Sequence, residues 1–233
     1  MTKALRRVGS LRRSRVDLPG SEVRLTIRRP KDFDLLLELA APDPEQNLPY
    51  WAELWPSGIA LAAKIARDPG ALGGQRVLEL GSGLGVTAIA ALRAGADLLV
   101  TDYAPEALAL CALNSLDETG VEPAALRLNW RDPSAQFFEL VGDGFPIVLA
   151  ADVLYERRDV EPLLGLVDRI VAPEGDLWLA EPGRAPAVDF VESIVDRGWQ
   201  QQSECCSGPW PDPEDNSKGV VVTIHVLRKP AIA

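Results

Sequence analysis

Histidine is nearly absent from this sequence, because the 233 residues contain only His225. A zinc site built from histidines is therefore not expected, and no nucleophile near His225 suggests a hydrolytic triad, so we expect a strand residue that packs or faces solvent. Cysteine is scarce as well: Cys111 stands alone, and Cys205 and Cys206 are adjacent, a spacing that does not suit a metal site. The sequence thus predicts no metal-binding residues and free, buried or surface thiols.

Long apolar runs are missing too. No stretch approaches the roughly 20 apolar residues that span a bilayer, and no segment has the apolar core of an export signal. We therefore expect no membrane contact and a cytoplasmic location. With 233 residues and 47% hydrophobic content, the chain has enough apolar surface for one core. A single domain is predicted over residues 21–233, and we expect a monomer.

Positive charge is concentrated at one end of the chain. Residues 1–30 hold nine lysines and arginines against two acids, whereas the other 203 residues hold fifteen against thirty-two. An acidic body binds nucleic acid poorly, because phosphate contacts need a basic surface, and it suits a basic protein segment that bears a lysine. Residues 1–20 are predicted to form a basic, disordered arm, although their arginine- and serine-rich composition also fits a transit peptide.

The central motif is a short apolar run followed by alternating glycines. Arg76–Leu80 is predicted to be a buried parallel strand with Glu79 near its end, and Gly81, Gly83 and Gly85 follow before a helical pattern begins. Glycine lets the backbone approach a ligand where a side chain would block it. The third glycine comes one place earlier than in the dinucleotide fingerprint, so the spacing favours S-adenosylmethionine (SAM) over a nicotinamide cofactor.

A second apolar run, residues 98–102, ends in Asp102, seventeen residues after Gly85. In a strand–helix–strand unit this acid lies at the carboxyl end of the neighbouring strand, where it can accept hydrogen bonds from two ribose hydroxyls. The two motifs together indicate a site for a nucleoside cofactor.

Other segments predict the alternating elements of an α/β protein. Helices are expected at residues 32–39, 57–67, 86–94, 105–118, 159–171 and 187–197. Further strands are expected at residues 22–28, 126–130, 145–155, 176–180, 199–207 and 219–227. The last two form an antiparallel pair joined by the proline-, aspartate- and glycine-rich stretch 208–219. The predicted fold is a doubly wound, mostly parallel seven-stranded sheet of the Rossmann-like type, with this C-terminal antiparallel pair and a short N-terminal strand extension.

Two aromatic segments allow two interpretations each. Tyr50, Trp51 and Trp55 either anchor their segment on the core, or Trp55 lines the cofactor pocket while Tyr50 or Trp51 faces the substrate. Trp130 either closes the core or flanks an adenine ring, with Asn129 near the edge of that ring.

Asp152 and Tyr155 follow a nearly continuous apolar run. Such a run is typical of a central parallel strand, and ligands lie beyond the carboxyl ends of such strands. If this strand neighbours the strand before the glycine motif, Asp152 lies beside the reactive end of the cofactor. The alternative role for Asp152 is that of a helix cap.

These residues together resemble the class I, or seven-β-strand, SAM-dependent methyltransferases, and more narrowly the protein-lysine methyltransferases. The segments 49–58 and 181–184 are most similar to the lysine methyltransferases of the electron-transfer flavoprotein β subunit and their bacterial relatives. The resemblance covers roughly residues 22–227. It implies SAM as cofactor and, as partner, a protein that presents a lysine, such as a flavoprotein subunit.

The resemblance also implies roles for individual residues. Asp152 and Tyr155 would face the incoming nucleophile as catalytic residues, and Asp102 would hold the ribose. The implied cofactor-binding residues are Trp55, Glu79, Gly81, Ser82, Gly83, Gly85, Asp102, Tyr103, Asn129, Trp130 and Ala151. One departure leaves the substrate open, because Glu181 stands where the flavoprotein enzymes usually have aspartate.

Other functions remain compatible with the sequence. A methyltransferase of a small amine or pyridine would suit the acidic, aromatic entrance equally well. A non-catalytic SAM-fold binding module is a further alternative, but it would be expected to lose the glycine loop or the ribose acid, and both are present. Methylation of nucleic acid is disfavoured by the acidic body and by the lack of an Asn/Asp-Pro-Pro-aromatic stretch.

Overall fold

The computed structural model describes residues 3–45, 47–211 and 218–231. The helices are α1 Lys3–Arg7, α2 Phe33–Ala40, α3 Pro56–Arg67, α4 Val86–Arg93, α5 Pro105–Thr119, α6 Ala135–Val141, α7 Val160–Ile170 and α8 Ala185–Asp196. The strands are β1 Leu11–Asp17, β2 Arg24–Pro30, β3 Arg76–Leu80, β4 Asp97–Asp102, β5 Ala124–Arg127, β6 Phe145–Ala151, β7 Val171–Glu181, β8 Gln200–Cys206 and β9 Val222–Arg228. Short 3₁₀ turns lie at η1 Tyr50–Ala52, η2 Pro69–Ala71 and η3 Arg157–Asp159.

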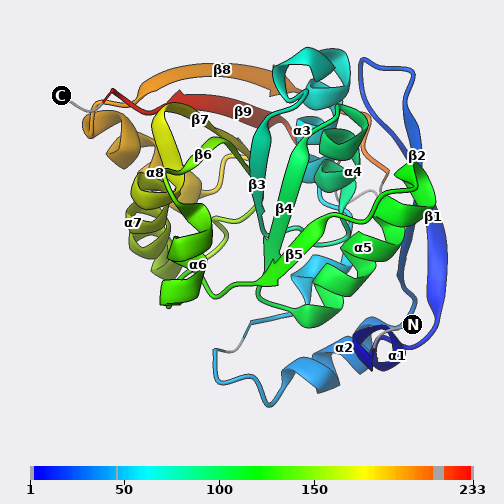
Figure 1. Ribbon diagram of the computed structural model, residues 1–233. Coiled ribbons are helices and arrows are strands. Elements are labelled where there is room, and N and C mark those ends of the chain that lie inside the picture. Colours follow the sequence, from blue (N-terminus) through cyan, green and yellow to red (C-terminus); the bar gives the residue numbers. More distant parts are fainter. Residues whose placement is uncertain (1–2, 46, 212–217, 232–233) are drawn as a thin grey trace.

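A seven-stranded sheet forms the centre of the protein, in the order β5-β4-β3-β6-β7-β9-β8 (Figure 1). The first five of these strands are parallel to one another, whereas β9 is antiparallel to both β7 and β8. The chain leaves β3 in one direction through β4 and β5 and then returns to β6 on the other side of β3. This reversal between β3 and β6 is the topological switch point of an open sheet, beside which ligands bind. The predicted fold class is thus confirmed.

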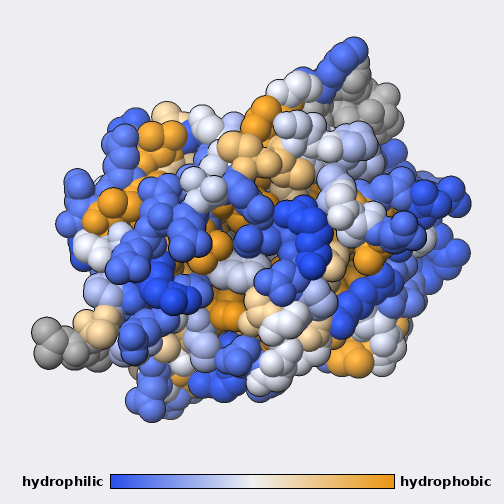
Figure 2. All heavy atoms as spheres, turned by 90° about the horizontal axis from the view of Figure 1, so that it is seen from above, coloured by the Kyte–Doolittle hydropathy of each residue, from blue (hydrophilic) through white to orange (hydrophobic). Residues whose placement is uncertain are grey.

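Helices cover both faces of the sheet (Figure 1). One hydrophobic core lies under α3, α4 and α5, where small side chains such as Ala60 and Ala88 are fully buried. The other core lies under α6, α7 and α8 and contains larger side chains such as Phe137 and Phe190. Seen from above, the molecule presents mainly hydrophilic side chains, with hydrophobic residues in small groups between them (Figure 2). No helix in the described part of the chain is long and apolar enough to cross a membrane.

The N-terminal residues differ from the expected disordered arm. Residues 3–7 form α1, and β1 pairs with β2 from Leu11↔Pro30 to Asp17↔Arg24 in a separate two-stranded sheet. Apolar residues explain this order, because Val16 and Leu18 are buried in the core while neighbouring arginines face solvent. The expected boundary at residue 20 falls inside this hairpin.

Several element ends also differ from the predictions. β5 ends at Arg127 rather than at residue 130, because its partner strand β4 ends at Asp102, whose carbonyl accepts one last hydrogen bond from the Leu128 amide. β6 ends at Ala151, since the next residue, Asp152, has a φ of 54° that a strand does not allow. The helix α6 was not predicted, although Ser134 caps it by accepting a hydrogen bond from the Phe137 amide. Residues 212–217 of the predicted linker lie outside the described residues.

Candidate active site

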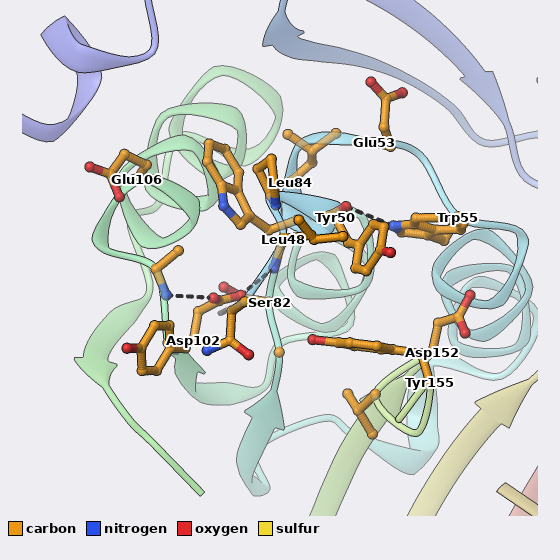
Figure 3. A pocket seen from close by; sticks show the side chains of 18 of the residues that line it. Leu48, Tyr50, Glu53, Trp55, Ser82, Leu84, Asp102, Glu106, Asp152 and Tyr155 are labelled. Carbon is orange, nitrogen blue, oxygen red and sulfur yellow. Dashed lines mark hydrogen bonds between the residues drawn. The ribbon is translucent and has the colours of Figure 1, made fainter. Parts of the chain in front are cut away.

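A cavity of about 860 Å³ opens at the carboxyl ends of β3, β4 and β6 (Figure 3). The glycine loop after β3 forms its floor, and residues 42–43 and 47–55 contribute another wall. Every residue predicted for the site lines this cavity except Gly85. Within the described ranges, no group of three or more histidine, cysteine, aspartate or glutamate side chains could hold a metal ion.

The glycine loop requires residues without a side chain. Gly81 and Gly83 have φ angles of 70° and 50°, which disfavour any other residue. A Cβ on Gly81 would lie 3.0 Å from Val153, and one on Gly83 would lie 3.4 Å from the Trp51 carbonyl oxygen. The loop is fixed from below, because the Ser82 amide donates a 3.0 Å hydrogen bond to the carbonyl of Thr101. The cavity floor is therefore bare backbone.

Gly85 does not line the cavity. It precedes α4 with a φ of 84°, and a Cβ there would lie 2.9 Å from the sulfur of Cys111 on α5. This glycine therefore allows α4 and α5 to approach each other, and it does not reach the cavity.

Asp102 projects its carboxylate into the cavity at the end of β4. Its oxygens accept hydrogen bonds from the amides of Gly83, at 3.0 Å, and Ala104, at 2.9 Å (Figure 3). Burial raises the pKa of Asp102 to about 6, although these backbone hydrogen bonds oppose the change. The carboxylate thus connects the glycine loop to the start of α5 and keeps further lone pairs for a ligand.

Glu79 supplies a second buried carboxyl group under the loop. Its Oε2 has no hydrogen-bond partner among the described residues. Burial, together with the nearby negative charge of Asp102, raises the pKa of Glu79 well above its ordinary value. An unpaired carboxyl oxygen in this position suits a ligand group that donates hydrogen bonds.

Trp130 closes the side of the cavity beyond Asp102. Its ring lies 3.7 Å from the position of a Cβ on Gly81, and its indole N–H donates to Asp159 at 3.2 Å. The neighbouring Asn129 accepts a 3.1 Å hydrogen bond from the Arg131 amide. Trp130 is therefore held beside the glycine loop, and its contact with an adenine ring stays a prediction.

Side-chain contacts tie Asp43 and Glu45 to this side of the cavity. The Tyr103 hydroxyl donates a 2.6 Å hydrogen bond to Asp43. Arg131 contacts Glu45 at 2.8 Å and Asp159 at 2.7 Å. Sequence reasoning found Tyr103 but missed these partners, because no local motif marks a residue whose partner lies far away in the chain.

The opposite half of the cavity contains Asp152 and three aromatic rings (Figure 3). The Tyr50 ring meets the rings of Trp55 and Tyr155 edge to face, with centroids 6.0 and 5.4 Å apart. The indole N–H of Trp55 donates a 2.8 Å hydrogen bond to the Tyr50 carbonyl. Burial raises the pKa of the Tyr155 hydroxyl, so this group stays protonated. Tyr50 and Trp55 thus line the cavity in the half that contains Asp152, and the contacts predicted for them with cofactor or substrate stay predictions.

Asp152 does not cap a helix, which excludes the alternative role for it. Its carboxylate accepts two hydrogen bonds from Arg184, from Nε at 2.9 Å and from Nη2 at 3.4 Å. Hydrogen bonding to Asp152 is the main cause of the raised pKa of Arg184. Arg184 was not predicted to be part of the site, and its position in the segment 181–184 is the signal that could have found it.

Glu181 and His225 hold the turn that carries Arg184. Glu181 accepts a hydrogen bond from the Gly183 amide and lies 3.2 Å from Nε2 of His225, whose Nδ1 lies 2.9 Å from the Gln201 amide nitrogen. Burial acts to raise the pKa of Glu181, but the contacts with His225 and with the turn outweigh it and lower this pKa. His225 is thus a buried strand residue that supports the turn, so of the two positions expected for it, packed or facing solvent, it has the packed one.

Comparison with known proteins identifies the family. A family model described as "lysine methyltransferase" matches residues 44–194. The electron transfer flavoprotein beta subunit lysine methyltransferase of Rattus norvegicus is 46% identical over 175 residues, which are 72% of this chain and 63% of that protein. Its counterpart in Danio rerio is 28% identical over 145 residues, or 60% of this chain and 53% of that protein. The chain therefore spans less than two thirds of the length of these two curated relatives.

A differently named relative and two solved structures extend this comparison. Histone-arginine methyltransferase METTL23 of Xenopus laevis is 27% identical over 163 residues, 68% of each chain. The N-methyltransferase NodS of Bradyrhizobium japonicum, solved with S-adenosyl-L-homocysteine, has a TM-score of 0.59 at 16% identity and covers 83% of this chain and 96% of its own. Magnesium protoporphyrin IX methyltransferase of Synechocystis, solved with SAM, has a TM-score of 0.56 at 16% identity over 74% and 77%. These two structures share the fold, and the family model places the chain in the lysine methyltransferase family.

Proposed function

We propose that this protein transfers methyl groups from SAM to the side-chain amine of a lysine in another protein. Membership of the lysine methyltransferase family supports the reaction class. The observation that carries the proposal is that one continuous cavity joins two halves of different chemistry. One half, around Asp102 and the glycine loop, suits a nucleoside, and the other, around Asp152 and the aromatic rings, suits an amine.

The residues of the first half fit SAM. The bare backbone at Gly81 and Gly83 admits close contact, and Asp102 can accept hydrogen bonds from both ribose hydroxyls. Trp130 would lie against adenine, and the unpaired oxygen of Glu79 suits a donor group of the ligand. When bound, SAM supplies a methyl group attached to a positively charged sulfur.

The second half has to orient an amine and let it lose its proton. A lysine ammonium has no free lone pair, so the site must hold the group while the proton leaves. Asp152 would orient it by a charge-assisted hydrogen bond, and Tyr50, Trp55 and Tyr155 would exclude water around it. Because the methyl donor is already activated, positioning would contribute most of the catalysis.

The acidic charge of this protein favours a substrate protein that has a basic region around its lysine. The β subunit of an electron-transfer flavoprotein is the first candidate to test, because it is the substrate named for two relatives. A cytoplasmic location and a monomeric state stay predictions.

Incubation of the purified protein with radiolabelled SAM and a cell extract tests this proposal. We expect discrete labelled proteins whose label maps to lysine. Label found only in small molecules would refute protein methylation in favour of a small amine as acceptor. SAM binding without any transfer would favour a binding module. Asp102→Ala should abolish the signal by weakening SAM binding, which calorimetry measures directly.

A further inference from the structure

The carboxylate of Asp152 already has a cation as its partner. Arg184 contacts both of its oxygens, at 2.9 and 3.4 Å, and the side chain of Asp152 is only 6% exposed. Removing that cation without replacement would leave a buried, unpaired charge, which is strongly unfavourable. Whatever enters this part of the cavity must therefore either leave Arg184 in place or bring a positive charge of its own.

The surroundings of this ion pair suit a cation in general. The guanidinium carbon of Arg184 lies 5.8 Å from the centre of the Trp55 ring, within the range of a cation–π contact. Tyr50 and Tyr155 continue the aromatic wall beside it, at nearly right angles to each other (Figure 3). A carboxylate beside several aromatic faces is the chemistry that binds alkylammonium groups.

We propose that Arg184 occupies the acceptor subsite of the resting protein and that the ammonium group of the substrate lysine displaces it from Asp152. This inference rests on the proposed lysine methylation. The exchange replaces one cation on Asp152 by another, so the buried carboxylate is paired in both states. Arg184 would thereby keep the subsite closed to neutral molecules and exclude acceptors that carry no positive charge.

The side chain of Arg184 can move away from Asp152 while its backbone stays in place. Its side chain is 38% exposed, so the guanidinium can turn into water at small cost. It follows Gly183, which has a φ of 83°, and Glu181 holds this turn through the Gly183 amide and His225. The turn is therefore anchored independently of the ion pair, and a swing of the side chain does not require the turn to open.

Competition between Arg184 and the substrate has a measurable consequence. While Arg184 occupies the subsite, the substrate ammonium cannot bind there. The apparent affinity for the substrate is therefore the intrinsic affinity multiplied by the fraction of molecules in which the subsite is free. Because the arginine of this ion pair is 38% exposed, we expect Arg184→Gln to bind an alkylammonium about fivefold more tightly. The binding gain should vanish when Asp152→Asn is added, because the two cations then no longer compete for a carboxylate.

The first experiment needs no cofactor. Nα-acetyl-lysine methylamide is titrated into the wild-type protein, Arg184→Gln and the double variant, and binding is followed by NMR. Arg228→Gln is the matched control, because Arg228 makes the same kind of two-point contact with Asp176 but lies outside the cavity. Tighter binding to Arg184→Gln alone supports the exchange. Equal or weaker binding overturns it and makes Arg184 a group that only positions Asp152.

The second experiment uses Arg184→Lys with SAM. If position 184 shares the subsite of the substrate, its amine should be methylated within the same molecule, at a rate independent of protein concentration. A C–N bond forms while the bond between methyl carbon and sulfur breaks, the electron pair stays on sulfur, and the ammonium proton passes to solvent.

Peptide mass spectrometry should find the added mass at position 184 and none in Arg228→Lys. An unmodified position 184, in a preparation whose wild type methylates proteins, refutes the exchange and leaves the proposed function intact. A wild type that binds SAM and methylates no protein lysine refutes the proposed function instead.

Discussion

Replacing Asn114 by alanine should cost about 3 kcal/mol of folding free energy. Asn114 lies on α5 and is fully buried. Its amide oxygen accepts a 2.8 Å hydrogen bond from the Arg28 amide, and its nitrogen donates to the carbonyls of Arg28, at 3.0 Å, and Leu84, at 2.9 Å. One side chain thus joins the N-terminal hairpin to the glycine loop.

The magnitude follows from what the substitution leaves behind. A hydrogen bond contributes about 1 kcal/mol net, and a buried group left without a partner costs about 1–3 kcal/mol. Water can reach the groups of Arg28, which is half-buried, but Leu84 is only 3% exposed. We therefore expect a loss near 3 kcal/mol, within about 2–4 kcal/mol, most of it from the unpaired Leu84 carbonyl.

Urea unfolding of Asn114→Ala measures this loss. For a denaturant dependence near 3 kcal/mol per molar, the midpoint should fall by about 1 M with an unchanged slope. The comparison variant is Glu118→Ala, which removes the contact with the Thr26 amide and the partly exposed ion pair with Arg93, and should cost about 1 kcal/mol. An Asn114→Ala midpoint no lower than that of the control would refute the reasoning.

Three other perturbations have defined outcomes. Because the pKa of Asp102 is raised to about 6, its carboxylate becomes protonated as the pH falls through that value and no longer accepts hydrogen bonds from the ribose, so SAM affinity measured by calorimetry should be about tenfold weaker at pH 5 than at pH 7. Asp102→Asn should bind SAM weakly at both pH values. The same tenfold change with pH in this variant would contradict the assignment of Asp102. Gly85→Ala would place a Cβ 2.9 Å from the sulfur of Cys111 at a φ of 84°, so thermal unfolding should show a loss of about 3 kcal/mol of folding free energy. Gly120→Ala, where φ is 75° and no atom lies within 4 Å of the new Cβ, should lose about 1 kcal/mol. Burial raises the pKa of Cys111, so a thiol reagent should modify exposed Cys205 in the native protein and reach Cys111 only in urea; rapid native labelling of Cys111 would show that α5 opens.

The sequence predicted the sheet well where local pattern and burial coincide. The run at Arg76–Leu80 is apolar because the strand is covered on both faces, and its glycine loop follows directly. Strand ends were less predictable, since they depend on a partner: β5 stops where β4 stops, at Asp102. The arginine-rich N-terminus was wrongly expected to be disordered. That expectation came from its overall composition, whereas the structure depends on the burial of two apolar residues, Val16 and Leu18.

In the candidate site, too, local motifs were predictable and long-range partners were not. Residues in short motifs, such as Asp102 and Asp152, were placed in the cavity by counting along strands. Their long-range partners were not, because nothing local to Asp152 indicates that Arg184 neutralises it. Gly85 shows the opposite error, in that a motif position that looks like a ligand contact is required by helix packing.

The position of β9 determines the order in which the molecule can be completed. This last strand lies between β7 and β8, both of which precede it in the chain, so the edge of β7 stays open until β9 arrives. An open edge invites pairing with other molecules, and such long-range pairing forms slowly. β9 also carries His225, so the turn that presents Arg184 gains its support last. A chain cut short before β9 would thus be prone to aggregation and would lack the His225 contact that supports the turn carrying Arg184.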